Sequence, residues 1–200
     1  MIEKNTEEKI VQAAEKVFIE KGLAGARMQE IADEAGINKA LLHYYYRSKE
    51  KLFEVVFKLA FKSFVPNLVK AFDGPEDFFT KIERFVETYL NLIEKNPHIP
   101  IFIINELSKN PNRLVSLISY LNIDIQPIFD VIEEEIEKKT IKQIEPQELI
   151  INILSLCVFP IVAKPMVQTI LFKGYESEYN ALMKKRKSSI AQFVISAIKN

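Results

Sequence analysis

The stretch Gln29–Tyr46, QEIADEAGINKALLHYYY, decides how the N-terminal part of this chain folds. It contains two short segments with helical periodicity, one over Met28–Ala35 and one that begins after Asn38, separated by Gly36. Glycine adopts a positive φ at little cost, so the chain can turn sharply there. The alanines of the first segment let the two helices cross closely. This pattern predicts a helix-turn-helix, although its spacing alone also fits an ordinary helical hairpin.

Helical periodicity continues through most of the remaining sequence. Apolar residues recur at steps of three and four, prolines fall between the periodic segments, and no alternating strand pattern of useful length occurs. We therefore predict an all-α chain of about nine helices. Beyond the helix-turn-helix we expect one helix between Thr6 and Gly22, and further helices over residues 49–72, 76–94, 101–108, 114–139 with a break near 122–127, 146–171 with kinks at the prolines, and 178–199.

The composition changes along the chain. Small residues and short helices characterise residues 1–47, whereas all 14 phenylalanines except Phe18 lie at or after Phe53. This shift predicts two parts, with a boundary between residues 47 and 48 and the motif at about residues 28–46. The second part holds the long, aromatic helices.

The composition also excludes several classes of protein. With 200 residues, 48% of them apolar, the chain can bury a substantial core. Its five scattered glycines cannot form a dinucleotide-binding or phosphate-binding loop. The single cysteine, Cys157, excludes an internal disulfide and a cysteine-rich metal site, and no H-E-x-x-H spacing occurs. We therefore predict no catalytic residue, no metal, no cofactor and no enzymatic activity.

Two segments bear on localisation. Residues Met1–Lys9 are charged and lack the apolar region of a signal peptide. The longest apolar stretch, Leu149–Ala163, is shorter than the roughly 20 residues of a membrane span. The sequence therefore predicts a cytoplasmic protein without a membrane partner.

The net charge is zero, with 27 basic and 27 acidic residues, but the charge is polarised. Residues 36–62 hold six basic residues against two acidic ones, whereas residues 130–148 hold seven acidic residues against three basic ones. A local basic region that follows the motif can bind phosphates even though the whole chain is neutral.

The run from Thr6 to Leu52 resembles the N-terminal domain of TetR-family transcriptional regulators. The matching stretches are TEEKI at residues 6–10, AAEKVF at 13–18, EKGL at 20–23, MQEIADEAGI at 28–37 and LLHYYYRSKEKLF at 41–53. The resemblance implies a homodimer that binds a palindromic double-stranded DNA operator. It also implies a repressor that a small hydrophobic effector releases from DNA, with residues 48–200 as the effector-binding and dimerisation domain.

By position, the resemblance implies a DNA-contacting set made of Arg27, Gln29, Lys39, Ala40, Leu41, His43, Tyr44, Tyr45 and Lys49. The start of the second motif helix and Gln29 would read bases in the major groove, and Arg27, Tyr45 and Lys49 would contact phosphates. Leu41 departs from the family, which carries a small hydroxyl residue there. It either loses a phosphate contact or touches a thymine methyl group. We expect Tyr46 to face the core.

The second part yields two further sets of candidates. The walls and polar groups of an effector pocket are expected at Phe57, Phe61, Phe64, Phe85, Tyr89, Phe102, Asn105, Glu106 and Tyr120. The resemblance places a dimer interface on the last two long helices, at Ile153, Leu154, Cys157, Val158, Ile161, Leu182, Ile190, Phe193, Val194 and Ala197. For both sets the alternative is intramolecular core. A different function, a helical ligand-binding adaptor that no longer binds DNA, remains open because of Leu41 and the neutral net charge.

Overall fold

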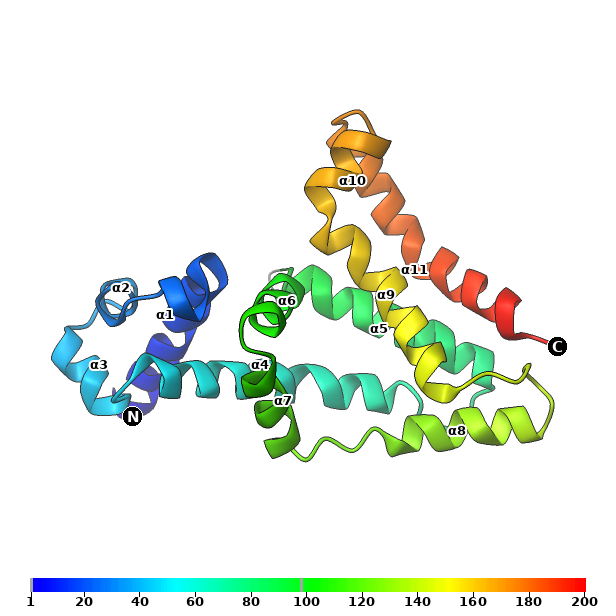
Figure 1. Ribbon diagram of the computed structural model, residues 1–200, viewed down its shortest axis with the longest axis horizontal. Helices are drawn as coiled ribbons and strands as arrows, with labels where there is room; N and C mark the ends of the chain where they lie inside the picture. The colour runs from blue at the N-terminus through cyan, green and yellow to red at the C-terminus, as the bar shows by residue number, and fades with distance from the viewer. Residues whose placement is uncertain (1, 98) are drawn as a thin grey trace. The chain divides into compact units, whose positions relative to one another are not determined.

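The computed structural model describes residues 2–97 and 99–200, without the side chains of residues 2–4, 63, 64, 113 and 114. The described residues form eleven α-helices and, outside them, a single isolated bridge between Ile141 and Lys199 (Figure 1). The all-α prediction is confirmed. The helices are α1 (Ile2–Gly25), α2 (Met28–Glu34), α3 (Lys39–Tyr45), α4 (Lys49–Lys70), α5 (Phe78–Lys95), α6 (Ile99–Lys109), α7 (Pro111–Tyr120), α8 (Gln126–Glu137), α9 (Pro146–Val162), α10 (Lys164–Leu171) and α11 (Glu176–Ile198).

Two of the expected long helices are each divided, which accounts for the additional elements. The chain leaves the helical conformation between α7 and α8, where Asn122 has φ 45°. The second division separates α9 from α10, which bend by 76° relative to each other. Prolines at 160 and 165 remove two backbone N–H donors around this bend, as the sequence predicts.

No single helix in the described ranges is long and apolar enough to cross a membrane. The bent pair α9 and α10 meets the length and composition criteria only when both helices are taken together.

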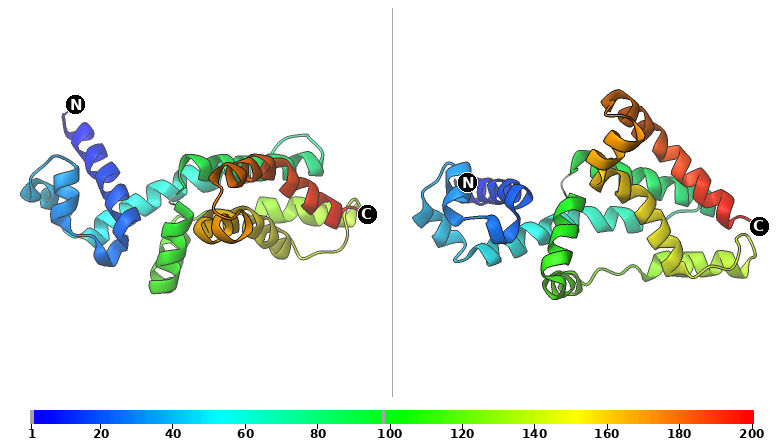
Figure 2. Two further views of the ribbon diagram at one scale, coloured as in Figure 1. Left: turned by 90° about the horizontal axis from the view of Figure 1, so that it is seen from above. Right: turned by 45° about the horizontal axis from the view of Figure 1, so that its top comes forward.

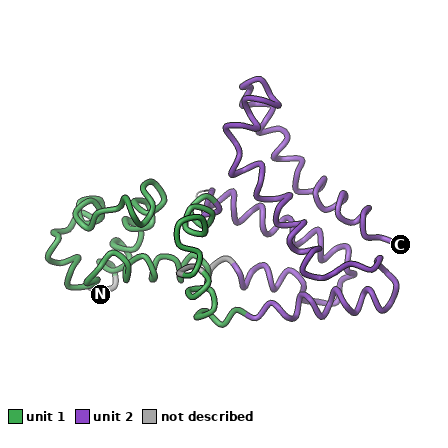
Figure 3. Tube along the Cα trace, viewed as in Figure 1, with its two compact units in different colours: residues 1–63, 101–123 green, residues 64–100, 124–200 purple. Residues whose placement is uncertain are grey.

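The described chain divides into two compact units (Figure 3). Unit 1 comprises residues 1–63 and 101–123, and unit 2 comprises residues 64–100 and 124–200. The division differs from the predicted boundary at residues 47/48, because α6 and α7 group with the N-terminal helices. Phe102 of α6 lies against Phe53 and Phe57 of α4, with ring centroids 5.2 Å and 6.4 Å apart, respectively. Helix α4 itself begins in unit 1 and ends in unit 2.

The core of unit 1 joins α1 to the helix-turn-helix and to α4. Phe18 of α1 meets Phe53 edge-on at 5.3 Å, and Ile31 and Leu42 from the two motif helices are fully buried in the same cluster. Burial of large apolar side chains stabilises such a cluster by about 1.5–3 kcal/mol per residue. The orientation of the motif helices therefore depends on α1 and α4.

The core of unit 2 is organised around α5, which packs against α9 and α11 (Figure 2). The carboxylate of Asp77 accepts the main-chain N–H groups of Phe79 and Thr80 and the Thr80 hydroxyl, which fixes the start of this helix. These hydrogen bonds also lower the pKa of Asp77. One face of α5 is buried throughout, at Phe78, Ile82, Phe85, Val86, Tyr89, Leu90 and Ile93. Its other face remains available for polar residues.

Candidate nucleic-acid interface

The turn between α2 and α3 has the geometry that the sequence predicts. Gly36 has φ 67°, and its amide donates to the Asp33 carbonyl at 3.1 Å. The amide of Ile37 donates to the Ala32 carbonyl at 3.0 Å, which closes the turn. Asn38 caps α3, since its Oδ1 atom accepts the N–H of Leu41 at 2.7 Å. The two helices therefore form a helix-turn-helix with a defined start for its second helix.

The inner side of the second helix is fixed in the core of unit 1. Leu42 is fully buried, and Tyr46, just after α3, is buried as predicted. The Tyr46 hydroxyl donates to the carboxylate of Glu7 on α1 at 3.0 Å. Burial, followed by the interaction with this carboxylate, raises the pKa of Tyr46 far above its usual value. This contact ties the end of the second motif helix to α1.

The outer side of the same helix is open. The predicted base-reading residues Lys39, Ala40 and His43 are all exposed, and the Tyr44 side chain is 77% exposed. Leu41 is also exposed, so this apolar side chain is not part of the core of unit 1. Tyr45 is half-buried and meets the Tyr44 ring edge-on at 5.6 Å. The side of α3 that faces away from Leu42 thus carries unburied side chains.

The flanking candidates have partners within unit 1. Gln29 is exposed on α2 and Arg27 is exposed just before it, and the Gln29 amide donates to Asp33 at 2.8 Å. The ammonium group of Lys49 donates to the carbonyl oxygens of Ala24 and Ala26, at 3.2 Å and 3.0 Å. Lys49 therefore ties the end of α1 to the start of α4, a role that the sequence did not indicate. Two of its three N–H donors are used, so one remains for a phosphate.

These features define a class of protein. A helix-turn-helix that is anchored on its inner side and exposed along the start of its second helix is the arrangement by which DNA-binding regulators enter the major groove. Residues 10–56 match the family described as "Bacterial regulatory proteins, tetR family", so this part of the chain is similar to the N-terminal domain of TetR-family DNA-binding transcriptional regulators.

Curated relatives agree with this assignment. The chain is 32% identical over 82 residues to the transcriptional activator FasR of Mycolicibacterium smegmatis and 41% identical over 59 residues to the transcriptional repressor NicS of Pseudomonas putida. These alignments cover 41% and 30% of this chain but only 37% and 28% of the respective relatives. A regulator of Bacillus subtilis, YttP, is 23% identical over 178 residues, which is 88% of this chain and 86% of that protein.

Solved structures share the fold over the whole chain. A TetR-family transcriptional regulator from Haemophilus influenzae has a TM-score of 0.69 at 16% identity, with all of both chains covered. A linker-substituted mutant of the HlyIIR protein has a TM-score of 0.70 at 24% identity, with 99% of each chain covered. At these identities the likeness establishes the fold and nothing further.

The predicted effector-pocket residues do not gather within one unit. Unit 1 holds Phe57, Phe61, Phe102, Asn105, Glu106 and Tyr120, unit 2 holds Phe85 and Tyr89, and the side chain of Phe64 lies outside the described residues. The rings at 57, 85 and 102 are buried in the cores of their units, the alternative that the sequence left open. Tyr120 is 72% exposed, with the Lys58 ammonium 4.0 Å from its ring centroid.

Glu106, predicted as a polar group of the pocket, is 2% exposed. Its Oε1 atom accepts the amide of Leu23 at 3.5 Å, and its Oε2 atom has no hydrogen-bond partner among the described residues. The Leu23 amide is free to reach it because α1 leaves the helical conformation at Gly22, which has φ 65° and ψ 173°. Glu106 therefore holds the end of α1 within unit 1.

The predicted dimer residues separate into two groups. Ile153, Cys157, Ile190 and Val194 are buried in the core of unit 2, the intramolecular alternative that the sequence left open. Burial also raises the pKa of the Cys157 thiol to about 12. The remaining candidates keep exposed surface: Leu154, Val158, Ile161 and Leu182 are half-buried, and Phe193 and Ala197 are exposed.

The described residues hold no group of three or more His, Cys, Asp or Glu side chains that could bind a metal ion. They do form a polar cleft between α4 and α5 that the sequence analysis missed. Its signal was present as polar residues at 84, 88, 91 and 95, spaced by four, three and four along one helix.

Proposed function

We propose that this regulator acts as a homodimeric repressor that binds a palindromic operator and leaves it when a small hydrophobic effector binds. The observation that carries the proposal is the exposed face at the start of α3, above a buried and capped inner side. A helix-turn-helix monomer covers one half-site, so two copies related by a two-fold axis would read a palindrome.

The DNA contacts are assigned by the chemistry of the exposed groups. Lys39 suits a guanine edge, Gln29 suits an adenine edge, and Ala40 and His43 lie beside them. Leu41 is exposed enough to touch a thymine methyl group. We assign phosphate contacts to the residues on both sides of this face, Arg27, Tyr44, Tyr45 and Lys49. Such contacts position the protein on DNA but do not read the base sequence.

The dimer interface is proposed on α9 and α11. Three large apolar side chains are largely exposed on these helices in the described subunit, Phe193 at 64%, Ile151 at 60% and Phe159 at 57%. A groove of about 360 Å³ lies between the two helices, lined by Ile144, Leu149, Asn152, Ser155, Leu156, Phe193, Val194, Ala197 and Ile198. Exposed apolar surface of this kind is typical of an interface, and a second copy of the same helices would cover it in a four-helix arrangement.

Release from DNA is proposed to work through α4. This helix starts with Lys49 in unit 1, which contains the helix-turn-helix, and ends with Lys70 in unit 2. An effector with a higher affinity for one position of α4 would shift the population of dimers. In the favoured state, the distance between the two helix-turn-helix motifs of the dimer would differ from the distance between successive major grooves, about 34–36 Å.

The test is a selection of bound sequences from random double-stranded DNA with the purified full chain, together with its mass in solution. We expect a palindromic consensus and a mass of twice 23.1 kDa. The variant Lys39→Ala should change the selected bases, whereas Lys184→Ala, an exposed lysine on α11, should not. A helical adaptor without DNA binding would give no enriched sequence even at low salt, and that result would overturn the proposal.

A further inference from the structure

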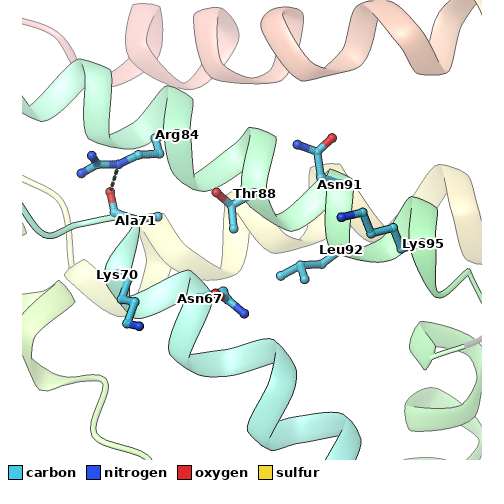
Figure 4. A pocket seen from close by; sticks show the side chains of 8 residues that line it. All are labelled: Asn67, Lys70, Ala71, Arg84, Thr88, Asn91, Leu92 and Lys95. Atoms are coloured by element: carbon cyan, nitrogen blue, oxygen red, sulfur yellow. Dashed lines mark hydrogen bonds between the residues drawn. The ribbon is translucent and has the colours of Figure 1, made fainter.

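A polar cleft of about 440 Å³ lies between the end of α4 and the exposed face of α5 (Figure 4). Its walls are Asn67, Lys70, Ala71, Arg84, Thr88, Asn91, Leu92 and Lys95. Figure 4 shows Thr88 at the middle of the cleft with Asn67 across from it, and Lys70 and Lys95 toward opposite ends. All of these residues belong to unit 2. The volume falls within the range of about 300–1,000 Å³ that is typical of small-molecule sites.

The charges that line the cleft are unbalanced. Three of its eight lining residues are basic and none is acidic. Arg84 is already neutralised, because its guanidinium donates to the carboxylate of Glu76 at 3.0 Å and to the carbonyl of Ala71 at 2.8 Å. Within the described part of the chain, Lys70 and Lys95 have no carboxylate within ion-pair distance. Among the described residues, two positive charges of the cleft therefore remain without an ion-pair partner.

The neighbouring carboxylate cannot supply the missing charge. Glu94 pairs with Lys187 of α11 at 2.8 Å, and the same ammonium donates to the side-chain oxygen of Asn91 at 2.7 Å. Lys187 thus neutralises Glu94 and holds the amide of Asn91 by its oxygen. Lys70 and Lys95 lie in the last turns of α4 and α5, where the negative end of the helix dipole stabilises a positive charge. This effect explains a lysine at each helix end but not why both line the same cleft.

We propose that this cleft binds the anionic group of a small molecule, a carboxylate or a phosphate. Lys70 and Lys95 supply positive charge from the two ends of the cleft, the Thr88 hydroxyl between them supplies a hydrogen bond, and Leu92 supplies an apolar contact for the rest of the molecule. Charge-assisted hydrogen bonds of this kind are the strong ones in ligand sites. The proposal deepens the proposed function, because it gives a chemistry to the effector, and it places one wall of the site on α4.

The experiment measures binding to the full-length protein without DNA, by titration calorimetry. The probes are inorganic phosphate, octyl phosphate, octanoate and, as the uncharged match, 1-octanol. The variants are Lys70→Gln and Lys95→Gln, with Lys184→Gln as the matched control because this lysine is exposed on α11 and does not line the cleft. Circular dichroism and thermal unfolding verify that each variant folds.

We expect at least one anionic probe to bind, with a loss of about tenfold or more in each cleft variant and none in the control. Octanoate alone would identify a carboxylate ligand, and either phosphate would identify a phosphoryl group. Equal binding of octanoate and 1-octanol, equal binding by all variants, or no binding of any anionic probe would each overturn the inference. Since DNA is absent, these results do not depend on operator binding.

Discussion

The guanidinium of Arg186 on α11 donates a hydrogen bond to the main-chain carbonyl oxygen of Leu156 on α9. Leu156 lies four residues before Pro160, which has no N–H to offer that carbonyl. The carbonyl of Pro160 is also reached from α11, because the Tyr179 hydroxyl donates to it at 3.1 Å. The bend between α9 and α10 is therefore stabilised by two side chains that replace missing helical hydrogen bonds.

This relationship predicts non-additive effects of substitution. Arg186→Ala should lower the free energy of unfolding by about 1–3 kcal/mol, because it leaves the Leu156 carbonyl unsatisfied. Pro160→Ala restores a backbone N–H that can donate to the same carbonyl. In that background, we expect the cost of Arg186→Ala to fall by about 1 kcal/mol. Urea unfolding of the four proteins in the double-mutant cycle measures the difference.

The neighbouring substitution Lys185→Ala is the control, since this lysine is exposed on α11 and its side chain makes no hydrogen bond or ion pair among the described residues. It should change the stability of both backgrounds by the same small amount. Additive effects of the Arg186 and Pro160 substitutions would contradict the prediction.

A second prediction concerns the cap of the recognition helix. Asn38→Ala removes the oxygen that accepts the Leu41 amide, so α3 should fray at its N-terminal end, the end proposed to contact DNA. We expect a loss of about 1 kcal/mol in stability and weaker operator binding. Asn38→Ser keeps an N-cap oxygen and should retain most of both properties. If the alanine and serine variants had the same stability and the same operator affinity, the prediction that the Asn38 cap stabilises α3 would be wrong.

Much of the helix-turn-helix could be predicted from sequence because the residues that determine its structure lie close together in the chain. Gly36 meets a need for positive φ, Asn38 provides a cap, and Leu42 and Tyr46 fall on one side of a short helix at a spacing of four. Each of these features depends on residues within one or two helical turns. The structure confirms the turn at Gly36 and the burial of Tyr46, and it shows the cap at Asn38 and the burial of Leu42.

The long-range contacts could not be predicted in the same way. Nothing near Lys49 indicates that its ammonium binds the carbonyls at the end of α1, and nothing near Glu106 indicates that it accepts the Leu23 amide, 83 residues away. An aromatic stripe also has the same spacing whether it lines a pocket or fills a core. The spacing therefore could not show that the rings at 57, 85 and 102 fill cores, and the sequence-based prediction also missed the polar cleft on α5.

A third prediction concerns alkaline pH. Burial raises the pKa of the Cys157 thiol from 9.0 to about 12, with Arg186 as an opposing influence. The folded state favours the neutral thiol, so this stabilisation is complete below about pH 9 and is lost as the pH rises toward 12. Stability should therefore fall less steeply over this interval in Cys157→Ala than in the wild type.

The comparison with Cys157→Ala is necessary because burial also raises the pKa values of Tyr89 and Tyr179, which both proteins retain. Cys157 adds to the raised pKa of Tyr89, so the substitution removes this effect together with the thiol. The same burial predicts that a thiol reagent modifies Cys157 only when the protein unfolds. Rapid modification of the folded protein at about pH 8, or identical pH profiles of the two proteins, would contradict this account.

The last prediction separates two roles of Lys49. Its ammonium is held by the carbonyls of Ala24 and Ala26, and its third donor is free for a phosphate. Lys49→Ala should therefore lower the thermal stability, weaken operator binding and reduce the slope of log affinity against log salt by about 1. Lys16→Ala removes the same charge from unit 1 but from an ammonium paired with Glu34 at 2.7 Å, and it should leave the slope nearly unchanged. A lower affinity for Lys49→Ala with an unaltered salt slope would show that this lysine only ties α1 to α4. In that case the phosphate contact would belong to another group at the start of α4.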